Sequence, residues 1–270
     1  MRKRESLAFQ KIPVPERQGK PRERGMTMMI DWGLNLGTQI DCLEAGGAFI
    51  DEAKIAAGIS RLMPLDYLRK KTAAYEAEGI LAFPGGLFAE LAIAQGNFEA
   101  FLQGAREAGF SAVEISDNLL EIPPDRKRAV ISKAAKSGFK VMGEVGKKEG
   151  SVSPEEMIAD IEGCLEAGAL KVLLEAHELF SGEIKKDVID AVTSKVPLDR
   201  IIFELPVLVL PGSSRDLKHR VLAWLVKEFG TEVNLANVEW DEVFITELVR
   251  RGMAGDTSHP QGAYRLAGFR

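Results

Sequence analysis

The sequence has 270 residues, 46% of them hydrophobic, with a net charge of −5 and only two cysteines. It shows no signal peptide and no apolar run of about 18 residues, so we expect neither a secreted protein nor a membrane-spanning one. The length is sufficient for one domain with a large core, and the low cysteine content is typical of a reducing compartment. The composition therefore predicts a soluble, cytoplasmic protein.

The first 25 residues differ in charge from the rest of the chain. They hold eight lysines and arginines against three glutamates, so this segment carries about +5 and the remainder about −10. Three prolines and the lack of a periodic apolar pattern predict an extended basic arm over 1–25, followed by one domain over 26–270. Such an arm could bind nucleic acid or phosphate. No aromatic residues alternate with basic ones elsewhere, so we expect no nucleic-acid partner and an arm that is solvated or lies across the acidic body.

From residue 26 onward, short runs rich in β-branched residues alternate with helical stretches of about 12 to 18 residues. This alternation is typical of a parallel sheet built by right-handed crossovers. The helix expected after Ser153 has a proline at its first position and a capping box completed by Glu156. The eight expected strands are 27–31, 48–54, 80–84, 112–116, 140–146, 171–176, 200–205 and 232–237. The pattern predicts a (β/α)8 TIM barrel, with a doubly wound open sheet as the alternative.

Charged residues recur at the C-terminal ends of these strands. Because side chains alternate between the two faces of a strand, residues at matching depth can point into the barrel mouth, where TIM-barrel enzymes have their active sites. Carboxylates gathered there need cations, and oxygen ligands suit Mg²⁺, while Lys54, Lys147 and Lys148 could supply fixed positive charge. The alternative is that single glutamates lie outside the barrel and bind loop amides. The carboxylates expected to converge are Asp31, Glu114, Glu144, Glu175 and Glu204.

Other motifs are less specific. Gly85 and Gly86 follow the third strand, where the backbone could approach an anion or simply form the turn. The segment 250–257 follows the last strand, a region where barrels often bind phosphate, although a solvated helix end fits equally well. The three histidines lack metal-ligand spacing, and only His177 stands at a strand end. Because the two cysteines are also far apart, neither a zinc site nor a thiol nucleophile is expected.

Eight segments stand out in chain order: KPRERGMTMMIDWG, FIDEAK, FPGGLFAELA, GFSAVEISDN, GEVGKK, IIFELP, EVNLANV and LVRRGMAGDT. Together they resemble one known family, that of the phosphosulfolactate synthases, which also includes plant heat-stress proteins. The resemblance covers about residues 20–257. It implies a (β/α)8 barrel, in a homo-oligomer, that adds sulfite to phosphoenolpyruvate with Mg²⁺, an early step of coenzyme M biosynthesis in methanogens.

The resemblance also implies roles for individual residues. Lys147, the first lysine of EVGKK, would be the acid/base, and Lys54 would neutralise phosphate or sulfite. Glu144 would act with these two lysines and, with Glu114, hold or position the metal, while Asp31, Glu175 and Glu204 are further candidate ligands. The expected substrate-binding residues are Gly85, Gly86, Ser116, His177, Asn234, Asn237 and Arg251.

The chain departs from the family pattern at positions that bear on the substrate. Trp32 replaces a lysine, His177 replaces an arginine and Leu87 replaces a threonine. Arginine binds carboxylate or phosphate through two parallel hydrogen bonds, which histidine cannot reproduce. Three hypotheses therefore remain: a synthase that adds sulfite to phosphoenolpyruvate, a barrel lyase that forms a metal-stabilised enediolate from another, less anionic carboxylate, and a non-catalytic heat-stress-type relative. Retention of Lys54, Glu144 and Lys147 argues against the third hypothesis.

Overall fold

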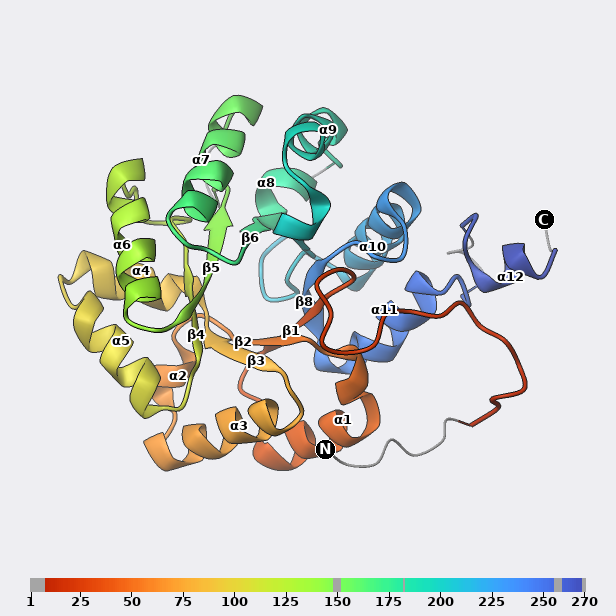
Figure 1. The fold of residues 1–270 in the computed structure, drawn as a ribbon, viewed down its shortest axis with the longest axis horizontal. Helices are drawn as coiled ribbons and strands as arrows, with labels where there is room; N and C mark the ends of the chain where they lie inside the picture. The colour runs from red at the N-terminus through yellow and green to blue at the C-terminus, as the bar shows by residue number, and fades with distance from the viewer. Residues whose placement is uncertain (1–7, 148–151, 182, 255–258, 269–270) are drawn as a thin grey trace.

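The computed structural model describes residues 8–147, 152–181, 183–254 and 259–268. Within these ranges eight parallel strands form one sheet in the order β3-β2-β1-β8-β7-β6-β5-β4. The end strands β3 and β4 lie side by side, so the sheet curls into a nearly closed barrel with its helices around the outside (Figure 1). The prediction of a (β/α)8 barrel is confirmed. The strands are β1 Thr27–Asp31, β2 Glu52–Ile55, β3 Leu81–Pro84, β4 Ala112–Ile115, β5 Lys140–Val145, β6 Lys171–Leu174, β7 Ile201–Glu204 and β8 Leu235–Glu239.

The helices follow the strands in the expected alternation. The predicted capping box is present at the start of α7, where Ser153 and Glu156 satisfy each other's backbone amides. Short 3-10 turns are η1 Gly47–Phe49, η2 Leu198–Arg200 and η3 Trp240–Glu242. The α-helices are α1 Leu36–Gly46, α2 Ile59–Leu62, α3 Leu65–Ala77, α4 Gly86–Ala94, α5 Phe98–Glu107, α6 Pro124–Lys136, α7 Pro154–Glu166, α8 Ala176–Phe180, α9 Lys186–Lys195, α10 Arg215–Phe229, α11 Val243–Arg250 and α12 Ala263–Leu266.

Two strands differ from their predicted ranges by more than two residues at one end. The second strand was expected over 48–54 but begins only at Glu52, because η1 occupies Gly47–Phe49. The eighth was expected over 232–237 but extends from Leu235 to Glu239, since its pairing with β1 and β7 begins at Leu235. None of the helices in the described ranges combines the length and the apolar character needed to cross a lipid bilayer.

Side-chain alternation along the strands decides what reaches the barrel mouth. Seven buried residues form a cluster of their own inside the barrel, whereas residues of the opposite parity pack against the helices. In each of β4, β5, β6 and β7, a glutamate follows two positions after the inner residue. Each of these four glutamates therefore points to the same inner face. The inner cluster consists of Met28, Phe83, Ala112, Met142, Leu173, Ile202 and Ala236.

Asp31 has the opposite orientation. Met28 faces the interior, so Ile30 lines the mouth and Asp31 points outward toward α3. Its carboxylate accepts a hydrogen bond from the Tyr75 hydroxyl at 2.8 Å and forms an ion pair with Lys71, also at 2.8 Å; both members of the ion pair are fully buried. The prediction that Asp31 converges with the glutamates is therefore wrong, by a register of one residue.

The basic arm lies against the opposite end of the barrel, where the strands begin. The Lys20 ammonium donates to the carbonyl of Ile50 at 2.5 Å, just before β2, and Arg22 forms an ion pair with Asp51. Arg17 is paired with Glu247 of α11. In Figure 1 the arm runs in from one side of the molecule to reach β1. Arg17, Lys20 and Arg22 thus serve as contacts to the body.

Glu52 is a buried carboxyl on the inner face of β2, 2% exposed. Burial, with a further contribution from Asp51, raises its pKa from 4.5 to about 8. The folded protein keeps this proton up to about pH 8 while the unfolded chain releases it near pH 4.5. The free energy of unfolding must therefore fall as pH rises through this interval, by at most about 5 kcal/mol at about 1.4 kcal/mol per pKa unit.

Replacing Glu52 with glutamine, which has the same shape but cannot ionise, should remove this decline. We expect Glu52→Gln to match the parent protein in stability near pH 4.5 and to exceed it by roughly 2–5 kcal/mol at pH 8.5. Urea unfolding of both proteins at the two pH values measures the difference. An unchanged stability difference between the two pH values would contradict a protonated Glu52 in the folded state.

Candidate active site

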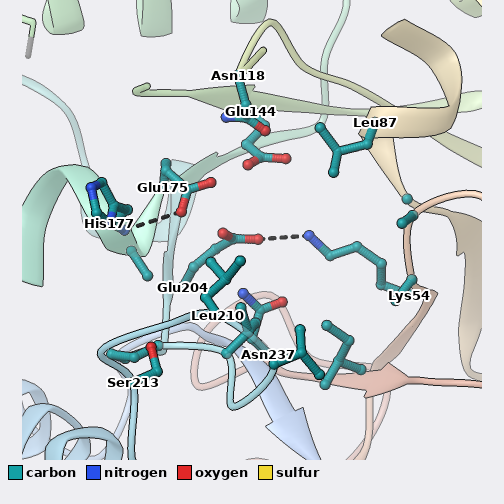
Figure 2. Close-up of a pocket in the computed structure, with 18 of the residues that line it drawn as sticks. Lys54, Leu87, Asn118, Glu144, Glu175, His177, Glu204, Leu210, Ser213 and Asn237 are labelled. Carbon is teal, nitrogen blue, oxygen red and sulfur yellow. Dashed lines mark hydrogen bonds and ion pairs between the residues drawn. The ribbon is translucent and has the colours of Figure 1, made fainter. Parts of the chain in front are cut away.

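The C-terminal ends of the strands surround a cavity of about 550 Å³. Its floor carries one lysine from β2 and the glutamates at the C-terminal ends of β4 to β7. Figure 2 shows Lys54 together with Glu144, Glu175 and Glu204 of this group. The connections after β1, β2, β3, β4, β6 and β7 form its rim. The charged floor residues are Lys54, Glu114, Glu144, Glu175 and Glu204. The expectation that the four glutamates converge is met.

Lys54 is the cation of this floor. Its ammonium lies 2.6 Å from a carboxylate oxygen of Glu204 and 3.1 Å from one of Glu114, and all three side chains are more than nine-tenths buried. Burial alone lowers the pKa of Lys54, but the nearby carboxylates outweigh it and hold this pKa well above its ordinary value. Lys54 is therefore charged at neutral pH and offsets part of the repulsion among the glutamates.

Glu114 lies between this lysine and Glu144. Its carboxylate accepts a hydrogen bond from the Gly86 backbone N–H at 3.1 Å, at the start of α4. Burial raises the pKa of Glu114 well above its ordinary value; Lys54 opposes the rise, and Glu144 adds to it. The floor thus combines the Lys54 ammonium ion, the Glu114 carboxyl with its raised pKa, and three further carboxylates.

Those three carboxylates are suited to a divalent cation. Glu144, Glu175 and Glu204 each offer one oxygen, and these oxygens lie within 4.8 Å of one another in a buried position. An all-oxygen donor set is what Mg²⁺ prefers. Glu175 also accepts a hydrogen bond from the His177 backbone N–H at 3.0 Å, which fixes its direction at the start of α8. The donor set therefore fits Mg²⁺, with Glu114 beside the group instead of within it.

Comparison with known proteins identifies the family of this chain. The model of the (2R)-phospho-3-sulfolactate synthase (ComA) family matches residues 15–256. The chain belongs to the phosphosulfolactate synthase family. The phosphosulfolactate synthase of Methanocaldococcus jannaschii is 35% identical over 247 residues, 87% of this chain and 94% of that one. That of Methanothermobacter thermautotrophicus is 32% identical over 256 residues, 90% and 95% of the two chains.

Among solved structures, the YdjI aldolase from Escherichia coli K12 superimposes with a TM-score of 0.54. It is 10% identical, over 84% of this chain and 80% of that one, so the similarity concerns the barrel fold alone. Membership of the phosphosulfolactate synthase family, in contrast, makes this chain a lyase-type enzyme.

Four of the substrate-binding residues expected from the family pattern line the cavity: Gly85, Gly86, His177 and Asn237. Asn237 reaches it through a bulge, because the β1 residues Thr27 and Met29 pair with Leu235 and Val238, and Asn237 adopts a left-handed backbone with φ 59°. That these residues bind substrate stays a prediction.

The two glycines are required by close packing. A Cβ atom on Gly85 would lie 2.6 Å from the backbone nitrogen of Ala57, and one on Gly86 would lie 2.5 Å from the Ser116 hydroxyl. Any larger residue would push α4 away from β4 and break the contact between Gly86 and Glu114. These glycines therefore allow the first turn of α4 to approach the cavity floor.

Three other expected residues lie outside the cavity. The Ser116 hydroxyl binds the buried carboxylate of Glu90. Asn234 precedes β8 at the opposite end of the barrel, where its amide donates to the Ile201 carbonyl at 3.0 Å. Arg251 follows α11, which returns the chain to that same end, and it donates to the Pro15 carbonyl at 2.7 Å. All three make structural contacts and do not line the cavity, so the structure does not bring them to the expected substrate site.

Lys147 lies at the rim and does not line the cavity. Its ammonium donates to the carboxylate of Asp117 at 2.6 Å and to the carbonyl of the same residue at 2.7 Å. Asp117 also binds the buried Lys127 at 2.8 Å, and Lys127 donates in turn to the Glu144 carbonyl and to Asp160. Lys148 lies outside the described residues. If Lys147 acts on a substrate at the floor, Asp117 is the group that positions it.

Asp117→Asn should therefore affect turnover more than stability. The change keeps an acceptor for Lys147 but removes the charge that holds it, and we expect kcat to fall roughly tenfold, as for other lost orienting contacts. The matched control is Asp160→Asn, which removes the other carboxylate of Lys127 and leaves Lys147 in place. Steady-state kinetics and thermal melts of both variants test this expectation. Equal kcat values in the two variants would show that Lys147 takes no part in the reaction.

Two contributors to the site were not foreseen from the sequence. Asn118 lines the cavity and donates to the Gly146 carbonyl at 3.0 Å, which ties the connections after β4 and β5 together. Glu90 of α4 accepts hydrogen bonds from the backbone amides of residues 118, 119 and 120, so it shapes that connection. The polar segment SDN after the fourth strand was a usable signal for Asn118, whereas nothing marks Glu90 within an apolar helix.

Proposed function

We propose that this enzyme is Mg²⁺-dependent and adds sulfite to phosphoenolpyruvate to give phosphosulfolactate, the reaction for which its family is named. The observation that carries the proposal is the buried group of Glu144, Glu175 and Glu204 next to the Lys54 ammonium. A homo-oligomer in the cytoplasm, acting on small anionic substrates, is the accompanying expectation.

The chemistry requires this kind of floor. The sulfite sulfur forms a bond to the methylene carbon of phosphoenolpyruvate, the double-bond electrons move into the carboxylate as an enediolate, and a proton is then added to the adjacent carbon. A Mg²⁺ ion bound by the three glutamates would stabilise the enediolate charge. Lys54 provides a second, permanent positive charge on the same floor. Lys147, oriented by Asp117, is the candidate proton donor.

Product formation from phosphoenolpyruvate and sulfite, with and without Mg²⁺, tests the proposal by mass spectrometry. We expect a product with the mass of phosphosulfolactate that depends on Mg²⁺, on sulfite and on an intact Glu144. Absence of this product from folded protein that still binds Mg²⁺ would exclude phosphoenolpyruvate and sulfite as the reactants. Absence of Mg²⁺ binding would exclude the metal site itself.

A less anionic carboxylate is the second candidate substrate, and the charge of the cavity favours it. Among the described lining residues Lys54 is the one lysine and there is no arginine. Its ammonium is already engaged by Glu204 and Glu114. Phosphoenolpyruvate brings a phosphate and a carboxylate, and sulfite brings further negative charge, to a floor that holds four glutamates. A substrate without the phosphate would meet less repulsion there.

A further inference from the structure

We propose that Glu90 is a positioning residue of the active site: its carboxylate holds the connection between β4 and α6, and that connection holds Lys147 at the rim of the cavity. The inference rests on the proposed function, in which Lys147 is the candidate proton donor. Glu90 itself does not line the cavity, so it acts on the reaction only through the residues that it holds.

Glu90 is a buried carboxylate in the middle of an apolar helix. The segment α4 has the sequence GLFAELAIA, and Glu90 is 3% exposed. A buried carboxylate destabilises the fold unless hydrogen-bond donors surround it. Packing of α4 against the barrel requires no charge at this position, so the donors that bind Glu90 indicate what it does.

Four donors from one short connection bind this carboxylate. One oxygen accepts hydrogen bonds from the Ser116 hydroxyl and from the Asn118 backbone N–H, the latter at 2.8 Å. The other oxygen accepts from the backbone N–H groups of Leu119 at 3.0 Å and Leu120 at 2.9 Å. Both oxygens of Glu90 are therefore engaged by residues that are distant in the chain.

The connection has no regular secondary structure of its own. Residues 116–123 form neither a helix nor a strand, so their backbone N–H groups lack the partners that such elements provide. Leu119 is 64% exposed, so burial of its side chain does not fix the turn. Glu90 supplies the acceptors for three consecutive N–H groups, 118 to 120, and thereby determines the path of this segment.

The same connection reaches Lys147 through two contacts. The Asp117 carboxylate accepts a hydrogen bond from the Lys147 ammonium at 2.6 Å. The Asn118 amide donates to the carbonyl of Gly146, the residue before Lys147, at 3.0 Å. Asp117 lies between two residues that Glu90 binds, and Asn118 is one of them. A shift of the connection must therefore disturb both contacts to the segment that carries Lys147.

The position of Glu90 on α4 also relates this connection to the cavity floor. Glu90 follows Gly86 by four residues, so the two lie on the same face of the helix, one turn apart. The Gly86 backbone N–H donates to Glu114 at 3.1 Å. One face of α4 thus contacts the floor with its first turn and, with its second, the connection that orients Lys147.

The test compares Glu90→Gln with the parent protein. Glutamine has the same shape, but its NH₂ group would face backbone N–H groups that need an acceptor. We expect kcat for phosphosulfolactate formation to fall about 10- to 100-fold, while KM for phosphoenolpyruvate and Kd for Mg²⁺ change by less than about twofold. Binding is preserved because Glu90 does not line the cavity that holds the three glutamates of the metal site.

Glu247→Gln is the matched control. Glu247 is also a buried glutamate of a helix, 5% exposed, but it pairs with Arg17 and Arg251 at the opposite end of the barrel. We expect this variant to lose stability in thermal melts and to keep its kcat. An equal loss of kcat in both variants would overturn the proposal, because kcat would then follow stability alone.

A second measurement probes Lys147 without turnover. Acetic anhydride acetylates free amines, and mass spectrometry of the peptide that contains Lys147 gives the rate at this position. We expect this rate to be at least about threefold higher in Glu90→Gln, because the amine is no longer held by its short hydrogen bond to Asp117. The rate should be unchanged in Glu247→Gln, and Asp117→Asn provides the reference for a released lysine.

The outcomes separate this inference from the proposed function. A parent protein that makes no phosphosulfolactate would contradict the proposed function, and the acetylation rates would still decide whether Glu90 positions Lys147. An unchanged acetylation rate in folded Glu90→Gln would overturn the inference, as would normal kcat of this variant in a protein that makes phosphosulfolactate. Glu90→Asp, which keeps the charge but is one methylene shorter, replaces Glu90→Gln if that variant does not fold. The same changes are expected of it, and their absence would equally overturn the inference.

Discussion

Lys54→Met is expected to lower kcat/KM by about 100- to 1,000-fold, the range seen when a fixed electrostatic partner of a developing charge is removed. The reason is the position of the ammonium ion, 2.6 Å from Glu204 and 3.1 Å from Glu114 on the cavity floor. Its loss leaves four carboxylates without their fixed cation. We also expect the variant to bind Mg²⁺ more tightly than the parent protein, because a divalent ion becomes the only neutralising charge.

Two measurements separate this effect from unfolding. Breaking a buried ion pair costs about 3–5 kcal/mol, so the free energy of unfolding of Lys54→Met must be measured beside its activity. The matched control is Lys133→Met, which removes an exposed lysine paired with Glu99 on the helical surface and should change neither quantity. Folded Lys54→Met with normal turnover would remove this lysine from the mechanism.

Glu144→Gln and Glu175→Gln are each expected to weaken Mg²⁺ binding by at least about 100-fold. Removing a residue that only supports a metal ligand costs about 10- to 100-fold, and removing a ligand should cost at least as much. Both replace an oxygen of the buried group with an uncharged amide while leaving Lys54 and its partner Glu204 intact. Calorimetric titration with Mg²⁺ in the absence of substrate measures the effect directly.

Glu239→Gln is the control for these two variants. Glu239 is also a buried glutamate at the end of a barrel strand, but it binds Lys218 and does not line the cavity. Its replacement should leave Mg²⁺ affinity unchanged. A similar loss of affinity in all three variants would show a general effect of charge, and unchanged affinity in Glu144→Gln would place the metal elsewhere.

Much of the barrel could be predicted from local patterns. Strands buried on both faces appear as short apolar, β-branched runs, and the capping box at Ser153 marks the start of a helix within one residue. The regular spacing of Glu114, Glu144 and Glu204 within their strands also sufficed to bring them to one end of the barrel. Each of these features depends on residues close together in the chain.

The wrong predictions concern which face or which end of the barrel a residue reaches. The outward position of Asp31 depends on a register of one residue, which only the packing of Met28 inside the barrel decides. Arg251 was expected at the substrate site because it follows the last strand, yet α11 carries it to the opposite end, against Pro15 of the arm. Proximity in sequence to a strand end did not determine which end of the barrel a side chain reached.

The sequence by itself determined the family, the eightfold alternation of strands and helices, and the presence of four strand-end glutamates with Lys54, because periodicity and motifs are properties of neighbouring residues. Only the tertiary structure decided which three glutamates come within 4.8 Å of one another, and that Lys147 is held by Asp117. It also decided that Leu87 and Leu210 face one cavity. These relations join residues that are far apart in the chain, and the closure of the barrel brings them together.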